Sequence, residues 1–235
     1  AAARAVVEER GDEAHAEARP SRPSSRRRAP FRGDGFDRAA EPPPRTIGFL
    51  ARLTPLKGPH HLVEAFILLR SQGRCPGVCL KIAGAQTGAD LPYVQQLQSR
   101  IAAAGLTSEV EFLPNLERRA KQDFLRSLTV LSVPAAGEAF GLYVLEALAC
   151  GVPVVLPADG AFPELLAATN GGVLYEPSGA GALADALAAV LLDPQRCDEL
   201  GSSGQQAVRE RFTADRMARA FADVCADVIQ QQSAP

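Results

Sequence analysis

The chain has 235 residues, of which 46% are hydrophobic and 22% are charged, and its formal net charge is −2. This length and composition predict one α/β core with short appendages. A nearly neutral charge, no tryptophan and three tyrosines provide neither a basic footprint nor many aromatic stacking platforms. Nucleic acid is therefore excluded as the main partner.

Residues 1–45 differ in composition from the rest of the chain. They hold 10 of the 25 basic residues and are rich in proline, without helical or strand periodicity. Such a segment buries too little apolar surface to offset the entropy lost on ordering, so it is predicted to be disordered or a truncated linker. The arginines at 26–28 leave open a contact with RNA or with anionic lipid, and hence peripheral association with a membrane, although a solvated run of charge is the better interpretation.

From residue 46 onward, short apolar runs alternate with longer stretches of helical periodicity. Strands are predicted at 47–51, 78–84, 110–114, 130–134, 152–157 and 172–176. Helices are predicted at 60–73, 91–106, 117–128, 141–151, 181–193, 196–212 and 214–229. Strands with nearly continuous apolar character are typical of parallel sheets covered on both faces. The predicted fold class is α/β, a doubly wound parallel sheet of about six strands that is Rossmann-like over residues 46–232.

The cysteines indicate the cellular compartment. There are five of them, without a CxxC pair: Cys75, Cys79, Cys150, Cys197 and Cys225. This pattern predicts free thiols in a reducing compartment, and metal binding by Cys75 and Cys79 is the weaker alternative because no second cluster lies at ligand spacing. The first ten residues lack the apolar core of a secretory signal, and no apolar run is long enough to span a membrane. The sequence predicts a cytoplasmic protein.

The loop after the first predicted strand carries two cations. In ARLTPLKG at 51–58, Arg52 and Lys57 precede a helix expected to start near Pro59. Ligands of doubly wound sheets bind beyond the carboxyl ends of the strands, where this loop is expected to lie. Two cations there suit a diphosphate, whereas two solvated loop charges are the alternative.

The loop after the fourth predicted strand contains a second candidate site. GEAFGL at 137–142 introduces a helix that is expected to begin near Phe140 or Gly141. The unpaired backbone N–H groups of Phe140, Gly141 and Leu142 would then form a site for phosphate oxygens. Glycine at 141 would let the ligand approach the backbone closely.

Two carboxylates flank that helix start. Glu146 lies five residues beyond Gly141, about 7–8 Å along a helix axis. A carboxylate at that distance can accept hydrogen bonds from ribose hydroxyls, and Glu138 on the other side can do the same for a second sugar. An exposed Glu146, with Glu138 as partner of the helix dipole, is the alternative. Two carboxylates around a phosphate site suggest a nucleotide sugar.

These motifs, with ALACGVPVV and the GAFPEL loop, resemble the donor-binding, C-terminal half of a GT-B retaining glycosyltransferase of glycosyltransferase family 4. The resemblance covers residues 46–229 and implies that the donor is a nucleoside-diphosphate sugar. It implies the following roles: Arg52 and Lys57 on the diphosphate, Glu138 on the transferred sugar, the amides of Phe140, Gly141 and Leu142 on donor oxygens, and Glu146 on the ribose. It also implies catalytic roles for Glu138, Arg52 and Lys57. No cofactor or metal is expected, because these cations and the helix N-terminus would neutralise the leaving diphosphate.

The chain departs from the family pattern in two ways. Ala139 stands where the family commonly has glycine, and the first 45 residues are too few for the N-terminal domain that would bind an acceptor glycan, lipid or small molecule. That domain normally supplies the catalytic histidine. His60 and His61 are not expected to replace it and are predicted to cap, pack or face solvent. The chain is therefore expected to be inactive alone.

A different class of function stays open. A stand-alone nucleotide-sugar binding or interaction module would carry the same donor residues without catalysis. An NAD-dependent enzyme is excluded, because no GxGxxG follows the first predicted strand. A starch or glycogen synthase is disfavoured by the absence of a Lys-x-Gly-Gly element.

Overall fold

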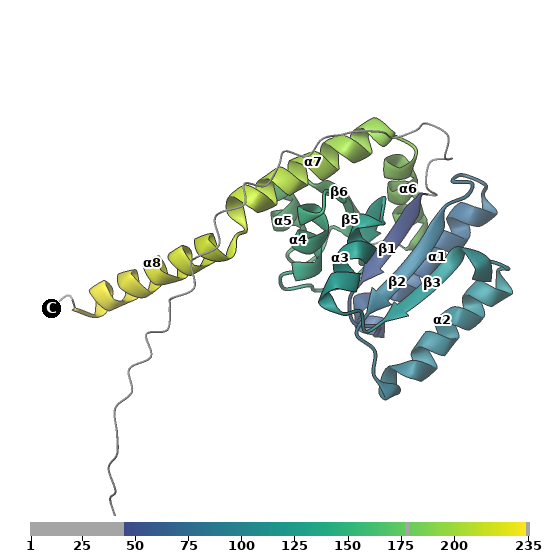
Figure 1. The fold of residues 1–235 in the computed structure, drawn as a ribbon, viewed down its shortest axis with the longest axis horizontal. Coiled ribbons are helices and arrows are strands. Elements are labelled where there is room, and N and C mark those ends of the chain that lie inside the picture. Colours follow the sequence, from purple (N-terminus) through teal and green to yellow (C-terminus); the bar gives the residue numbers. More distant parts are fainter. Residues whose placement is uncertain (1–44, 177–178, 234–235) are drawn as a thin grey trace, which may run out of the picture. The chain divides into compact units, whose positions relative to one another are not determined.

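The computed structural model describes residues 45–176 and 179–233, and it confirms the predicted parallel α/β sheet (Figure 1). Six strands form one sheet in the order β3-β2-β1-β4-β5-β6, and every pairing is parallel. The strands are β1 (Thr46–Leu50), β2 (Cys79–Gly84), β3 (Val110–Pro114), β4 (Val130–Ser132), β5 (Val154–Pro157) and β6 (Gly172–Tyr175). The chain order reverses between β1 and β4, which makes their carboxyl ends the switch point where ligands bind in such sheets.

The helices alternate with the strands as predicted, with one addition. They are α1 (Pro59–Ser71), α2 (Leu91–Ala103), α3 (Arg118–Arg126), α4 (Leu142–Ala149), α5 (Phe162–Thr169), α6 (Ala180–Leu191), α7 (Pro194–Arg211) and α8 (Ala214–Ser233). Helix α1 packs against α6, whereas α4 and α5 pack against α7. Helix α5 corrects the prediction of a loop at GAFPEL, because a proline in its first turn is compatible with a helix start.

The core explains why the central strands have nearly continuous apolar sequences. Every residue of β1, β4 and β5 is buried, since helices cover both faces of the sheet. The largest fully buried side chains include Phe49, Phe66 and Phe162. The edge strand β3 is only partly buried. Burial is thus greatest around β1 and β4, the two strands that flank the switch point.

Gly58 brings two loops together at the switch point. It has φ 70°, and it both ends the short 3-10 turn at Pro55–Lys57 and precedes α1. A Cβ atom built on Gly58 would lie 2.1 Å from the carbonyl oxygen of Pro134, which follows β4. This close approach requires glycine, and it places Lys57 beside the loop that carries Glu138.

Three further sequence predictions concern the N-terminal segment, the cysteines and membrane-spanning helices. The disorder predicted for residues 1–45 falls almost wholly outside the described residues. The five cysteines are free thiols, with Cys75 buried and Cys225 exposed. Within the described ranges, no helix combines the length and apolar character needed to cross a bilayer.

His60 and His61 lie in the first turn of α1, where packing and exposure were predicted for them. The Nδ1 atom of His60 lies 2.7 Å from the hydroxyl oxygen of Tyr93, and the two imidazole rings are 4.0 Å apart. His61 is exposed and His60 is half-buried. Burial, followed by the charges of His61 and Arg100, lowers the pKa of His60, although Glu64 acts in the opposite direction.

The lowered pKa of His60 predicts a loss of stability in mild acid. Below its ordinary pKa of 6.5 the unfolded chain binds a proton at this position more readily than the folded chain. The free energy of unfolding is therefore expected to fall from about pH 6.5 downward and to level off below the folded pKa. Urea unfolding across this range, for the protein and His60→Gln, checks the effect. The variant is expected to have the shallower pH dependence, and equal slopes would contradict the prediction.

Candidate functional site

Glu138 forms the centre of the candidate site. Its Oε2 accepts a hydrogen bond from the Lys57 ammonium at 2.7 Å and another from the Tyr143 hydroxyl at 2.6 Å. Its Oε1 accepts a long bond of 3.4 Å from the backbone N–H of Phe140. The Glu138 side chain is 11% exposed and that of Lys57 is 28% exposed. The structure thus joins Lys57 to Glu138, two residues that the sequence assigned to one ligand.

The surroundings of Glu138 keep it ionised. Burial alone raises the pKa of a carboxyl group, because it disfavours the charged form. In Glu138 the hydrogen bonds from Lys57, Tyr143 and Phe140, together with the charge of Lys57, outweigh burial and hold the pKa below its usual value. The group is therefore a hydrogen-bond acceptor at neutral pH.

The main chain around Glu138 is fixed by the loop between β5 and α5. The Asp159 carboxylate accepts a hydrogen bond from the Gly137 N–H at 2.7 Å, and the Ala161 N–H donates to the Glu138 carbonyl at 2.8 Å. Gly160 lies between these contacts with φ 58°, and a Cβ atom there would come within 2.5 Å of the Glu138 carbonyl oxygen. The two loops therefore meet at Gly160, and a larger residue there would require the loops to move apart.

The start of α4 lies beside Glu138 and modifies one prediction. The helix begins at Leu142, directly after Gly141, which has φ 77°. The predicted helix start near Gly141 is therefore confirmed. The Phe140 N–H, however, is not unpaired as predicted, because it donates to Glu138 Oε1. The amides of Gly141 and Leu142 belong to the α4 N-terminus, where backbone N–H groups lack acceptors within the helix.

Glu146 lies on α4 and forms an ion pair that the sequence did not predict. Its Oε1 accepts a hydrogen bond of 2.5 Å from the Lys121 ammonium of α3. Its side chain is 40% exposed. A small cavity of about 200 Å³ adjoins the pair and is lined in part by Arg118, Gln122 and Cys150. The carboxylate is therefore accessible to a ligand but already has a cationic partner.

Arg52 is separate from these ion pairs. It is exposed in the loop after β1, and among the described residues the cation paired with Glu138 is Lys57 and not Arg52. Its charge acts on Asp90: hydrogen bonds from Thr87 are the main cause of the lowered pKa of that carboxyl group, and Arg52 adds to the effect. The predicted pairing of Arg52 with Lys57 on one diphosphate therefore stays a prediction.

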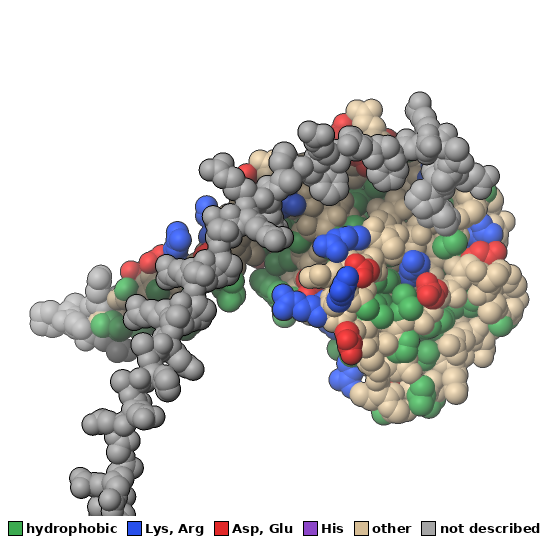
Figure 2. All heavy atoms as spheres, in the orientation of Figure 1, with side chains coloured by type: hydrophobic (Ala, Val, Ile, Leu, Met, Phe, Trp, Pro, Cys, Tyr) green, Lys and Arg blue, Asp and Glu red, His purple; other side chains and the backbone are tan. Residues whose placement is uncertain are grey.

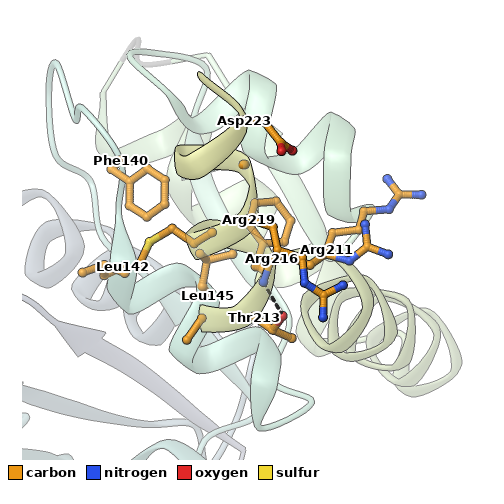
Figure 3. A pocket seen from close by; sticks show the side chains of 12 residues that line it. Phe140, Leu142, Leu145, Arg211, Thr213, Arg216, Arg219 and Asp223 are labelled. Carbon is orange, nitrogen blue, oxygen red and sulfur yellow. Dashed lines mark hydrogen bonds between the residues drawn. The ribbon is translucent and has the colours of Figure 1, made fainter. Parts of the chain in front are cut away.

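A groove adjoins the start of α4 on the side of α7 and α8 (Figure 3). It has a volume of about 710 Å³, and Phe140, Leu142 and Leu145 line it together with Arg216 and Arg219. The residues Phe140 and Leu142 are 52% and 65% exposed. These two residues therefore present apolar side chains to the groove, while their backbone groups belong to the start of α4.

The site combines opposite charges. Figure 2 shows basic side chains beside acidic ones on the visible face, around the region where Figure 1 places α3. Helix α3, with the sequence RRAKQDFLR, contributes Lys121 to the pair with Glu146. Ionised carboxylates can accept hydrogen bonds from sugar hydroxyls, and lysines can bind phosphate oxygens. The arrangement can thus hold a ligand that carries both kinds of group.

The fold and the site together define the class of protein. A doubly wound parallel sheet whose polar residues gather at the switch point is a Rossmann-like domain. The chain belongs to the family Glycosyl transferases group 1, whose model matches residues 34–207.

Two similar proteins from different organisms share one name, D-inositol 3-phosphate glycosyltransferase. The chain is 35% identical over 147 residues to the D-inositol 3-phosphate glycosyltransferase of Mycolicibacterium smegmatis, covering 63% of this chain and 32% of the relative. It is also 35% identical over 188 residues to the enzyme of that name from Xylanimonas cellulosilytica, covering 80% and 43%. The chain thus spans less than half the length of these relatives.

Solved structures support the same family. The C-terminal domain of a glycosyl transferase group 1 family protein from Francisella tularensis superposes with a TM-score of 0.65 and 26% identity, over 72% of this chain and 87% of that one. The Anabaena protein HepE in complex with UDP-glucose gives a TM-score of 0.70 at 26% identity, over 77% and 48%. The described fold is therefore similar to one domain of a known glycosyltransferase.

Proposed function

We propose that residues 46–232 form the donor-binding half of a retaining glycosyltransferase of family 4, which transfers a sugar from a nucleoside-diphosphate sugar to an acceptor. The observation that carries the proposal is the contact of Lys57 with Glu138 beside the start of α4, at the switch point of a group 1 glycosyltransferase. UDP-glucose is the first donor to test, because HepE was solved with it.

Each site residue has a proposed role. Lys57 and Arg52 bind the diphosphate together with the amides of Gly141 and Leu142, and the Phe140 amide joins them if it leaves Glu138. Glu138 accepts hydrogen bonds from the transferred sugar, and Glu146 accepts them from the ribose. The cations and the start of α4 neutralise the leaving diphosphate, so that no metal is required.

The proposed reaction retains the anomeric configuration. The acceptor hydroxyl attacks the anomeric carbon on the face from which the diphosphate leaves. Its proton passes to an oxygen of the departing phosphate as the carbon–oxygen bond to that phosphate breaks. Acceptor binding is assigned to residues outside this domain, so we expect donor binding without transfer by the domain alone. The acceptor, whether glycan, lipid or small molecule, stays open, and a peripheral membrane contact or a cytoplasmic location stays a prediction.

Calorimetric titration with UDP and UDP-glucose, in the presence of a chelator, tests the donor site. Glu146→Gln is expected to weaken both ligands by similar factors of about tenfold, because a charge-assisted hydrogen bond to the ribose is lost. Glu138→Gln is expected to weaken UDP-glucose and spare UDP, which has no transferred sugar.

Glu199→Gln on α7 is the matched control and is expected to leave both affinities unchanged, because this residue pairs with Gln195 on the same helix. Titration with GDP and GDP-mannose distinguishes the base. If a folded protein binds none of the four ligands, the donor-site proposal is wrong for this domain. If binding requires a divalent cation, the metal-independent arrangement is wrong.

A further inference from the structure

Tyr143 is not one of the residues that the sequence motifs or the family resemblance assigned to donor binding. It is the second residue of α4, and its hydroxyl donates to Glu138 Oε2 at 2.6 Å. The residue is half-buried. Burial, followed by the hydrogen bond to Glu138 and the charge of that carboxylate, raises the pKa of Tyr143 far above its ordinary value. The phenol therefore keeps its proton at neutral pH and remains a donor.

The two oxygens of Glu138 differ in their partners. Oε2 accepts from Lys57 and from Tyr143, both at short distance, whereas Oε1 has among the described residues only the 3.4 Å bond from Phe140. A carboxylate oxygen can accept more than one hydrogen bond. Oε1 is consequently the oxygen with free capacity for a ligand hydroxyl.

A bound diphosphate would change this arrangement. The Lys57 ammonium would turn at least in part toward the phosphate oxygens, because the phosphate and the Glu138 carboxylate compete for its three donor hydrogens. Among the described residues, Glu138 is the acceptor found for the Tyr143 hydroxyl, and α4 fixes the Tyr143 backbone. Its bond to Oε2 would then be the contact that still orients Glu138.

Resting on the proposed function, we propose that Tyr143 is a positioning residue: it holds Glu138 Oε2 so that Oε1 faces the hydroxyls of the transferred sugar while Lys57 binds the diphosphate. Tyr143 thereby contributes to the recognition of the sugar and leaves the nucleotide untouched. The phenyl ring alone would fill the same space without orienting the carboxylate.

Tyr143→Phe tests this role by calorimetric titration with UDP and UDP-glucose. The variant is expected to weaken UDP-glucose about three- to tenfold, the range for one lost hydrogen bond, and to leave UDP within about twofold of the parent protein. Tyr93→Phe is the matched control, because it removes a hydroxyl that contacts His60 instead of Glu138. It is expected to change neither affinity.

A double-mutant cycle separates positioning from a general structural effect. In a Glu138→Gln background, Tyr143→Phe is expected to add little to the loss of UDP-glucose affinity, because the two residues act through one contact. UDP-glucose affinity is expected to fall when the pH is lowered far enough to protonate Glu138. In Tyr143→Phe this fall is expected to begin at a higher pH than in the parent protein, because removing the hydroxyl raises the pKa of Glu138.

Three outcomes would overturn the role of Tyr143. Equal weakening of UDP and UDP-glucose would indicate a structural effect, unchanged affinities would show that the hydroxyl is dispensable, and additive losses in the cycle would show that it acts independently of Glu138. If the parent protein binds neither ligand, the proposed function fails and this role with it. If the parent protein binds UDP, a negative result with Tyr143→Phe contradicts only the role of Tyr143 and not the proposed function.

Discussion

Replacing Lys57 with alanine is expected to weaken UDP binding by about 1.5–3 kcal/mol, roughly 10- to 150-fold, because a charge-assisted hydrogen bond to the diphosphate is lost. The substitution also leaves Glu138, with only 11% of its side chain exposed, without its cationic partner beside the phosphate site. Calorimetric titration with UDP measures the effect. Circular dichroism establishes that the variant is folded.

Lys81→Ala provides the matched control for this prediction. The Lys81 side chain is 29% exposed, close to the 28% of Lys57, but it donates to Ser127 at the end of α3. Its loss is expected to leave UDP affinity unchanged. The double variant Lys57→Ala/Glu138→Gln shows how much of the loss is repulsion by the unpaired carboxylate. Unchanged UDP affinity in Lys57→Ala would remove Lys57 from the diphosphate site.

Gly160→Ala is expected to destabilise the protein by about 2–5 kcal/mol. A left-handed backbone costs a residue with a Cβ about 1–2 kcal/mol, and relieving overpacking costs about 1–3 kcal/mol more. The new Cβ would lie 2.5 Å from the carbonyl oxygen and 2.7 Å from the nitrogen of Glu138. Urea unfolding measures the change, and UDP-glucose titration shows whether the displaced loop also weakens sugar binding.

Gly181→Ala is the control for the glycine prediction. Gly181 lies in the first turn of α6, and a Cβ built there meets no atom within 4 Å. Its replacement is expected to be neutral or to stabilise by up to about 1 kcal/mol, because alanine favours the helix. Equal effects of the two substitutions would show that the approach of the loops at Gly160 carries no strain.

The sheet and most helices were predictable because apolar periodicity is a local property of the sequence. The glycines that end predicted helices, Gly73, Gly105 and Gly151, have φ between 65° and 77°, as expected of such ends. Helix α5 was missed because it has only eight residues, with a proline in its first turn and Gly160 two residues before its start. Short helices with turn-forming residues at their start are poorly distinguished from loops by sequence.

The sequence indicates which residue types lie at the candidate site but not which contacts they form. Lys57 and Glu138 were assigned from separate loops, and their ion pair depends on the approach of those loops at Gly58 and Pro134. The hydrogen bonds of Tyr143 and Asp159 depend on how the chain folds back around Glu138, which no spacing in the sequence specifies. The pairing of Lys121 with Glu146 likewise requires α3 and α4 to pack together.

The carboxylates of Glu138 and Glu146 are each paired with a lysine, which affects how a charged donor would reach the site. Lys57 with Glu138 and Lys121 with Glu146 form two locally neutral pairs in the free protein. Neutral pairs produce a weak field at distances beyond the Debye length, so they attract an approaching diphosphate little. The long-range attraction of the diphosphate would therefore come mainly from Arg52, which is exposed and lies outside these pairs. The attraction by the two lysines would develop at short range, as they exchange a carboxylate for a phosphate.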